Sequence, residues 1–143
     1  MTPAFSSQSD DSSFLALVLQ VLGVEKPEGA LPLPVDLMID GQFPVRICQV
    51  RQRWVVCGTI ATEISECEEY ALLSLLERAS GMWGTLEGTF CYEKKEDILV
   101  LWRDISDSKE QELESIMSRF LEELEFWRME GAEAGCTGRE VFP

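Results

Sequence analysis

The segment that most constrains the fold lies near the C terminus, where apolar residues recur at every third or fourth position. This spacing predicts an amphipathic helix from about Ser108 to Met129. Acidic residues near its start suit the positive end of the helix dipole. Because the helix has one apolar stripe, it needs a second layer of structure to cover that stripe. The stripe consists of Leu113, Ile116, Met117, Phe120, Leu124 and Trp127.

A second helix is predicted at the other end of the chain, from Phe14 to Leu22. Ser12 or Ser13 is placed to cap it, and Gly23 is placed to end it in the left-handed conformation. This segment is apolar almost all round, so it is either buried on several sides or partly reserved for a partner. The proline-rich stretch over residues 25–34 then indicates a connecting loop.

From residue 35 the apolar pattern changes to the alternation of β-strands. Residues 35–39 form the first strand, and Asp40-Gly41 is a strong hairpin turn into a second strand over residues 43–48. The polar run from Gln49 to Arg53 turns the chain into a third strand over residues 54–60. Three consecutive strands with short links predict antiparallel pairing.

The pattern becomes helical again at Ser65, which forms a capping-box arrangement with Glu68. This helix ends at Ser80-Gly81, and residues 85–92 and 98–103 then form two strands joined by the charged turn from Glu93 to Asp97. The apolar face expected for the helix consists of Tyr70, Leu72, Leu73, Leu76 and Ala79.

These elements predict an α+β domain with an antiparallel sheet of about five strands and three helices, in the order α-β-β-β-α-β-β-α. The chain has 143 residues, which is the length of one domain. We expect the domain to cover residues 13–130, with flexible tails at 1–12 and 131–143.

The charge of the chain narrows the classes of partner. With 26 acidic and 12 basic residues, the formal net charge is -14, which repels nucleic-acid phosphates and anionic membranes. No apolar stretch approaches the ~18 residues of a membrane span. The first apolar segment lacks the basic flank of a signal peptide. The five cysteines are odd in number and show no paired spacing, so we expect reduced thiols in a cytosol.

The sequence contains no histidine, which removes Ser-His-Asp and Cys-His catalysis and histidine-based zinc sites. The acidic groups Glu66, Glu68 and Glu69, and Glu122, Glu123 and Glu125, are expected to be solvated helix faces, because no calcium-loop spacing is present. We therefore predict no catalytic residue, no metal site and no cofactor.

The C-terminal half resembles a known family. A leucine-rich helix ending in Ala79-Ser80-Gly81 precedes a glycine-containing strand, the strand segment ILVLWRDI, and a long acidic helix carrying the pair Phe126-Trp127. This constellation, with the element order and the acidity, is similar to the class I type III secretion chaperones, the family of the Tir chaperone. The resemblance covers roughly residues 13 to 130. It implies a homodimer in the bacterial cytosol that holds the N-terminal segment of a secreted effector in extended form.

The resemblance also implies two sets of site residues. Dimers of this family form through the second helix and the following strand, and the effector lies in apolar grooves made by the first helix and the sheet. The dimer residues implied here are Tyr70, Leu73, Leu76, Leu86 and Phe90. The effector-binding residues implied here are Phe14, Leu15, Leu17, Val18, Val21, Leu22, Val45, Arg46, Ile47, Trp54 and Val56.

Three alternatives stay open at this point. Val55 and Cys57 are further candidates for groove walls if the strands face the other way, because a shift of one residue exchanges the faces of a strand. Arg46, Arg51 and Arg53 form a basic strip that either is solvated or meets acidic client residues. A small adaptor or regulatory domain that binds a folded partner is the alternative function.

Overall fold

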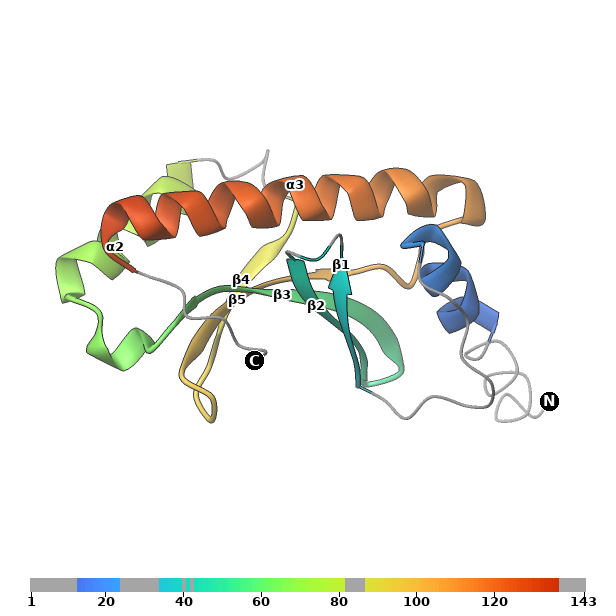
Figure 1. The fold of residues 1–143 in the computed structure, drawn as a ribbon, viewed down its shortest axis with the longest axis horizontal. Helices are drawn as coiled ribbons and strands as arrows, with labels where there is room; N and C mark the ends of the chain where they lie inside the picture. The colour runs from blue at the N-terminus through green and yellow to red at the C-terminus, as the bar shows by residue number, and fades with distance from the viewer. Residues whose placement is uncertain (1–12, 24–33, 40, 42, 82–86, 137–143) are drawn as a thin grey trace.

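The fold of the chain is known from a computed structural model that describes residues 13–23, 34–39, 41, 43–81 and 87–136. Five antiparallel strands form one sheet in the order β1-β2-β3-β5-β4, and the helices lie along one face and at the ends of that sheet (Figure 1). This confirms the predicted α+β class and element order. The strands are β1 (Val35–Ile39), β2 (Phe43–Val50), β3 (Arg53–Thr62), β4 (Thr89–Glu93) and β5 (Ile98–Asp104). The helices are the first helix (residues 13–21), α2 (Glu69–Gly81) and α3 (Glu110–Ala134), with a short 3-10 turn at Ile64–Glu66.

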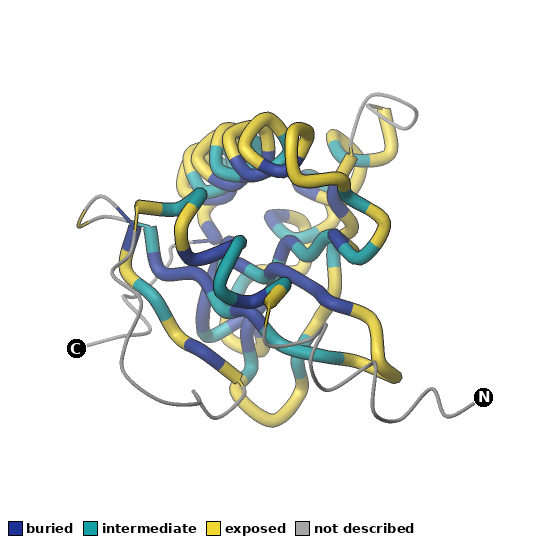
Figure 2. Tube along the Cα trace, turned by 90° about the vertical axis from the view of Figure 1, so that its right-hand side faces the viewer, coloured by how far each residue is buried: buried dark blue, intermediate teal, exposed yellow. Residues whose placement is uncertain are grey.

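Helix α3 covers one side of the hydrophobic core. Its buried residues follow the predicted stripe, and Figure 2 shows buried positions on the side of the helix turned toward the sheet. Phe120 and Trp127 are among the largest side chains that are fully buried. None of the helices in the described ranges is long and apolar enough to cross a membrane.

A glycine in the middle of β3 allows α3 to approach the sheet closely. A Cβ atom at Gly58 would lie 2.5 Å from Cδ2 of Leu124 in α3, which is closer than carbon atoms can pack. Gly58 therefore identifies the side of the sheet on which α3 lies. We call this side the α3 face, and the opposite side the outer face.

The turn between β2 and β3 is shorter than the predicted polar run. Strand β2 continues to Val50 and β3 begins at Arg53, so the turn consists of Arg51 and Gln52. Both residues have positive φ, 51° and 68°, as two-residue hairpins require to match the twist of the strands. Gly41 also has a positive φ of 69°, whereas its predicted turn partner Asp40 lies outside the described residues.

The ends of the first and last helices differ in how well the sequence places them. Gly23 has φ 74° and its N–H bonds to the carbonyl of Gln20, as expected for a helix end. Helix α3 continues past the predicted end at Met129 to Ala134, where Gly135 caps it with φ 96°. Cys136 is buried, so the first six residues of the predicted C-terminal tail, 131–136, pack with the domain. Residues 1–12 and 137–143 of the predicted tails lie outside the described ranges.

The start of α2 corrects the predicted capping box. The 3-10 turn occupies Ile64–Glu66 and α2 begins at Glu69, so Ser65 is not the cap of α2. Its N–H and its hydroxyl both donate to the carboxylate of Asp97, in the turn between β4 and β5. A tertiary partner has therefore replaced the local partner that the spacing suggested.

Strand β4 is also shorter than the predicted strand over residues 85–92. Residues 85 and 86 lie outside the described ranges, and the backbone N–H groups of Glu87 and Gly88 donate to the carboxylate of Glu123 in α3. Because these donors are used by a helix side chain, regular pairing with β5 begins only at Thr89. Glu123 therefore has a structural role as a hydrogen-bond acceptor, although its position in an acidic run predicted only a solvated helix face.

Candidate protein-binding surfaces

The strand register assigns the predicted sheet residues to one face or the other. Val45 pairs with Gly58, and Ile47 pairs with Val56, so these side chains lie on the α3 face. Trp54 has the same parity in β3, and all four apolar side chains are buried. The structure therefore brings Val45, Ile47, Trp54 and Val56 together in the core beneath the helices, and not at a surface.

The outer face holds the residues of opposite parity, and no described helix covers it (Figure 1). Cys57 lines a groove on this face, as the alternative strand parity expected, whereas Val55 is buried and is not part of the groove wall. The groove has a volume of about 190 Å³ and lies between strands β2, β3 and β5 and the turn after β4. Its lining residues include Pro44, Arg46, Cys48, Cys57, Glu96 and Val100.

The first helix is part core and part surface. Leu15, Val18 and Leu19 are buried in the hydrophobic core. The other predicted effector-binding residues of this helix are only partly buried and pack at the margin of the core. They are Phe14, Leu17, Val21 and Leu22.

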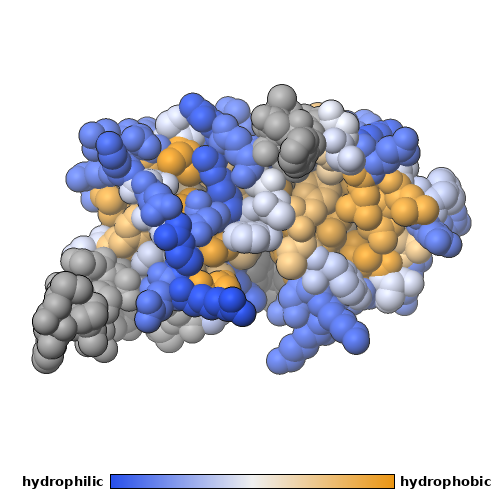
Figure 3. All heavy atoms as spheres, turned by 180° about the vertical axis from the view of Figure 1, so that it is seen from behind, coloured by the Kyte–Doolittle hydropathy of each residue, from blue (hydrophilic) through white to orange (hydrophobic). Residues whose placement is uncertain are grey.

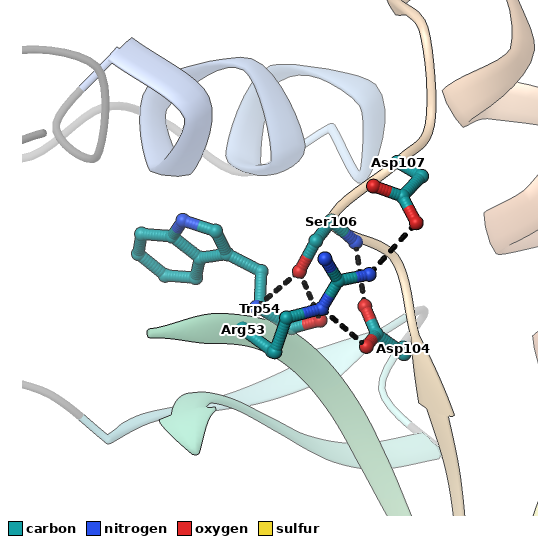
Figure 4. A network of polar contacts seen from close by, with 5 residues as sticks. All are labelled: Arg53, Trp54, Asp104, Ser106 and Asp107. Atoms are coloured by element: carbon teal, nitrogen blue, oxygen red, sulfur yellow. Dashed lines mark hydrogen bonds and ion pairs between the residues drawn. The ribbon is translucent and has the colours of Figure 1, made fainter. Parts of the chain in front are cut away.

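A network of polar contacts fixes the backbone of Trp54, whose side chain packs against the first helix (Figure 4). The Trp54 N–H donates to Oγ of Ser106 over 2.6 Å, and the Trp54 carbonyl accepts from the N–H of Ile105. The indole ring lies 5.6 Å from the ring of Phe14, centroid to centroid. Trp54 is therefore fixed through its backbone while its side chain supports the helix.

Arg53 closes the same network from the edge of β3 (Figure 4). Its guanidinium donates to the carboxylates of Asp104 and Asp107, each over 2.8 Å. Burial acts to raise the pKa of Asp104, but hydrogen bonds from Arg53 and Ser106 outweigh burial and lower it. The network thus ties the start of β3 to the segment that leads into α3.

The predicted basic strip is largely neutralised by acids from other strands. Arg46 donates to Asp36 of β1 over 2.6 Å and lies 3.8 Å from a carboxylate oxygen of Glu96. Arg53 is paired as described above, and Arg51 lies exposed on the turn. The acids that pair with Arg46 and Arg53 all lie outside the segment from Gly41 to Thr62. That segment therefore looked more basic in the sequence than the folded surface is.

Helix α2 presents apolar side chains to solvent. It is anchored by Ala71 and Leu75, which are buried. Of the apolar face predicted for it, only Leu72 and Ala79 pack against the core. Tyr70 is 70% exposed and Leu73 is 56% exposed, and Leu76 is exposed as well. We call Tyr70, Leu73 and Leu76 the α2 surface. Seen from behind, Figure 3 shows a broad hydrophobic area at the end of the molecule that carries α2.

A hollow adjoins the α2 surface and extends it onto β4. It has a volume of about 440 Å³, and Leu76 and Phe90 are among its lining residues. Phe90 packs edge-on against the buried ring of Trp127, with 4.9 Å between centroids. Four of the five predicted dimer residues therefore lie on α2 or β4, and Leu86 lies outside the described residues.

The turn between β4 and β5 holds the segment that precedes α2 in place. Asp97 has φ 58°, and its carboxylate accepts hydrogen bonds from the N–H and hydroxyl of Ser65 and from the hydroxyl of Tyr92. The Ser65 hydroxyl and then the Tyr92 hydroxyl lower the pKa of Asp97. No sequence motif marks this residue, because its donors come from two separate segments.

Replacing Asp97 with asparagine is expected to loosen the segment before α2. Asparagine tolerates the positive φ but offers one acceptor oxygen to three donors. Because the folded-state pKa of Asp97 is lowered, its contribution is present above the unfolded pKa of about 3.9 and is lost as pH falls through the folded value. We expect Asp97→Asn to lower the midpoint of thermal unfolding by a few degrees at pH 7 and to change it less at pH 3. Equal shifts at both pH values would contradict this.

Neither the carboxylates nor the thiols form a metal site in the described ranges. No group of three or more cysteine and acidic side chains is placed to hold an ion there. Cys136 is buried beside Cys67, and burial followed by the hydrogen bond to Cys67 raises the pKa of Cys136 to about 11. The first helix and the α2 surface both present apolar side chains suited to another polypeptide.

Comparison with known proteins gives a family and a fold. The model of the Tir chaperone protein (CesT) family matches residues 34–128, about two thirds of the chain. No curated protein sequence matches the chain.

Three solved structures share the fold at low sequence identity. The structure of the ExsC–ExsE complex aligns with a TM-score of 0.64 and 19% identity, covering 85% of this chain and 92% of that one. The HopA1–SchA chaperone–effector complex aligns with a TM-score of 0.59 and 16% identity, covering 78% and 88%. The Yersinia pestis type III secretion chaperone SycH, solved with a stable fragment of YscM2, aligns with a TM-score of 0.55 and 18% identity, covering 81% and 98%.

Proposed function

The chain belongs to the Tir chaperone protein (CesT) family, and we propose on this premise that it is a type III secretion chaperone. It binds the N-terminal segment of a secreted effector in extended form and keeps that segment competent for secretion in the bacterial cytosol. The observation that carries the proposal is the match of the family model to residues 34–128, which span all five strands and α2.

The solved relatives support the class of partner. One of them is a chaperone–effector complex and another is a type III secretion chaperone bound to a fragment of a second protein. An extended segment gains affinity from backbone hydrogen bonds and apolar pockets with little demand on its sequence. Ordering such a segment costs entropy, so the chaperone needs exposed apolar area to offset it.

The client surface proposed here is narrower than the predicted set of residues. It consists of the half-buried residues of the first helix, Phe14, Leu17, Val21 and Leu22, together with Arg46 in the groove of the outer face. These side chains remain in contact with solvent, whereas Leu15, Val18 and the four buried strand residues support them from below.

We propose that the protein acts without catalysis. The sequence has no histidine, and the thiols and carboxylates of the described ranges form no group that could hold a metal. Binding energy alone is sufficient for the proposed role, because holding an extended segment requires no bond to be made or broken.

We also propose that two copies associate through the α2 surface and the adjoining hollow on β4. An exposed tyrosine and two exposed leucines next to a hollow are apolar area that a second copy covers well. In a two-fold dimer each residue of the patch appears twice, so a small patch on one chain gives a symmetric interface.

The client is identified by affinity capture of the full chain in its native host, followed by mass spectrometry. The N-terminal segment of the captured protein is then produced alone and titrated against the chaperone by calorimetry. We expect binding, with backbone amides of the segment protected from hydrogen exchange only when the chaperone is present. If the client is protected from hydrogen exchange as a folded domain is, the protein is an adaptor instead. If the segment does not bind, the proposal is wrong.

A matched pair of variants locates the client surface. Leu17→Asp places a charge among the apolar residues of the first helix and is expected to weaken binding of the segment by tenfold or more, which is about 1.4 kcal/mol. Gln20→Asp adds the same charge at an exposed position of that helix and is expected to bind normally. Circular dichroism of both variants checks that the helix is retained. Equal binding by both would place the client elsewhere.

A further inference from the structure

Two thiols lie side by side on the outer face of the sheet, in the groove that contributes Arg46 to the proposed client surface. Cys48 in β2 is opposite Val55, and Cys57 in β3 is opposite Arg46, so the two cysteines occupy diagonal positions on neighbouring strands. Both line the groove of about 190 Å³, together with Arg46. Both are partly exposed, so reagents in solution have access to them.

The surroundings favour a thiolate on Cys48. A hydrogen bond from the Cys57 thiol, and then the positive charge of Arg46, lower the pKa of Cys48 to about 7, against the opposing effects of burial and of Asp36. The pKa of Cys57 is raised, first by its hydrogen bond to Cys48 and then by burial. The pair therefore loses its first proton readily. The negative charge then lies on Cys48, and Cys57 keeps its S–H. The charged and titratable groups that face the pair are Arg46, Asp36, Cys91, Glu93 and Glu96.

The strand geometry disfavours a disulfide between the two thiols. Diagonal positions on neighbouring antiparallel strands hold their Cα atoms roughly 7–8 Å apart. A disulfide needs Cα atoms within about 7 Å and well-directed Cβ atoms, so closing this pair would require the sheet to distort. A substituent placed on Cys48 is therefore not readily displaced by Cys57.

We propose that Cys48 is a modification site that accepts a mixed disulfide from a low-molecular-weight disulfide such as oxidised glutathione. The Cys48 thiolate attacks one sulfur of that disulfide and forms a new S–S bond. The other half leaves as a thiolate, which takes a proton from solvent, so no further oxidant is needed. The groove receives the substituent next to Arg46. The site does not depend on the chaperone function, because its chemistry requires no client.

The test treats the full chain with oxidised glutathione and maps the adduct on peptides by mass spectrometry. We expect one glutathionyl group on Cys48 first, with a rate that rises with pH and levels off above pH 7. Cys57→Ala removes the hydrogen-bond donor and is expected to move the inflection toward the ordinary thiol pKa of about 8.5. At pH 7 the rate should then fall about threefold, because the loss of thiolate is partly offset by greater nucleophilicity.

Two serine variants separate the site from other thiols. Cys48→Ser is expected to abolish the fast phase, whereas Cys91→Ser removes the most exposed cysteine and is expected to leave that phase unchanged. First modification at Cys91, or at Cys67, would overturn the proposal. A Cys48–Cys57 disulfide in place of the mixed disulfide would also overturn it, because the strand geometry argument would then be wrong.

Discussion

Replacing Leu73 with glutamate is expected to convert the proposed dimer to a monomer while leaving the fold of the chain intact. Leu73 is 56% exposed on α2, so a glutamate there is solvated in the single chain. In the proposed dimer two such carboxylates would be buried without partners, one from each copy. An unpaired polar group costs about 1–3 kcal/mol when it is buried, so two raise the dissociation constant by about 30-fold or more.

Sedimentation at several concentrations measures this change directly, since it separates the mass of two chains from that of one. The matched control is Gln111→Glu in the first turn of α3, which adds the same charge at an exposed position away from α2. We expect the control to remain dimeric. If Leu73→Glu also stays dimeric over the same concentrations, the two copies do not meet through the α2 surface.

Truncating Trp127 to alanine is expected to be the most destabilising single change in the chain. The indole is fully buried and packs edge-on against Phe90 of β4 and Phe126 of α3, both at 4.9 Å between centroids. Its loss leaves a large cavity beneath the strand that borders the α2 surface. Cavities of this kind cost about 3–5 kcal/mol, which is a large share of the roughly 5–15 kcal/mol that holds a domain folded.

Trp127→Phe is expected to cost less than half as much, for two reasons. Phenylalanine keeps most of the aromatic packing, and it removes Nε1, a buried donor that has no hydrogen-bond partner within the described residues. Urea unfolding at one fixed protein concentration measures both variants, because the apparent stability of the proposed dimer would depend on concentration. Trp102→Phe on the outer face is the control, and we expect it to change the midpoint little. A small effect of Trp127→Ala would mean that β4 is held mainly by other contacts.

Helices, strands and turns could be predicted from the sequence wherever the local residue pattern fits only one type of secondary structure. The stripe from Leu113 to Trp127 has helical spacing and no competing alternation, and the structure buries all of its residues except Ile116, which is partly buried. The alternation of Val35, Leu37 and Ile39 and the left-handed Gly23 are equally local signals. The class of function also followed from the sequence, because the order of elements and the ILVLWRDI segment carry the family resemblance.

The face of each central strand could not be predicted in the same way. Strand β3 contains Trp54, Val55, Val56 and Cys57 in succession, so apolar residues occupy both parities. Only the packing of Leu124 against Gly58 shows which parity lies beneath α3. The same ambiguity applied to α2, where leucines surround the helix and contact with α3 decides which of them are buried.

The charged residues show the same division. Arg46 looked like part of a basic strip because its partners Asp36 and Glu96 are brought to it by β1 and by the turn after β4. Ser65 looked like a helix cap because its true partner, Asp97, is 32 residues away. Periodicity, turn residues and the absence of histidine are properties of neighbouring residues or of the whole composition, and the sequence determined these by itself. Strand faces, ion pairs and the proximity of Cys48 to Cys57 depend on contacts between distant segments, and only the tertiary structure decided them.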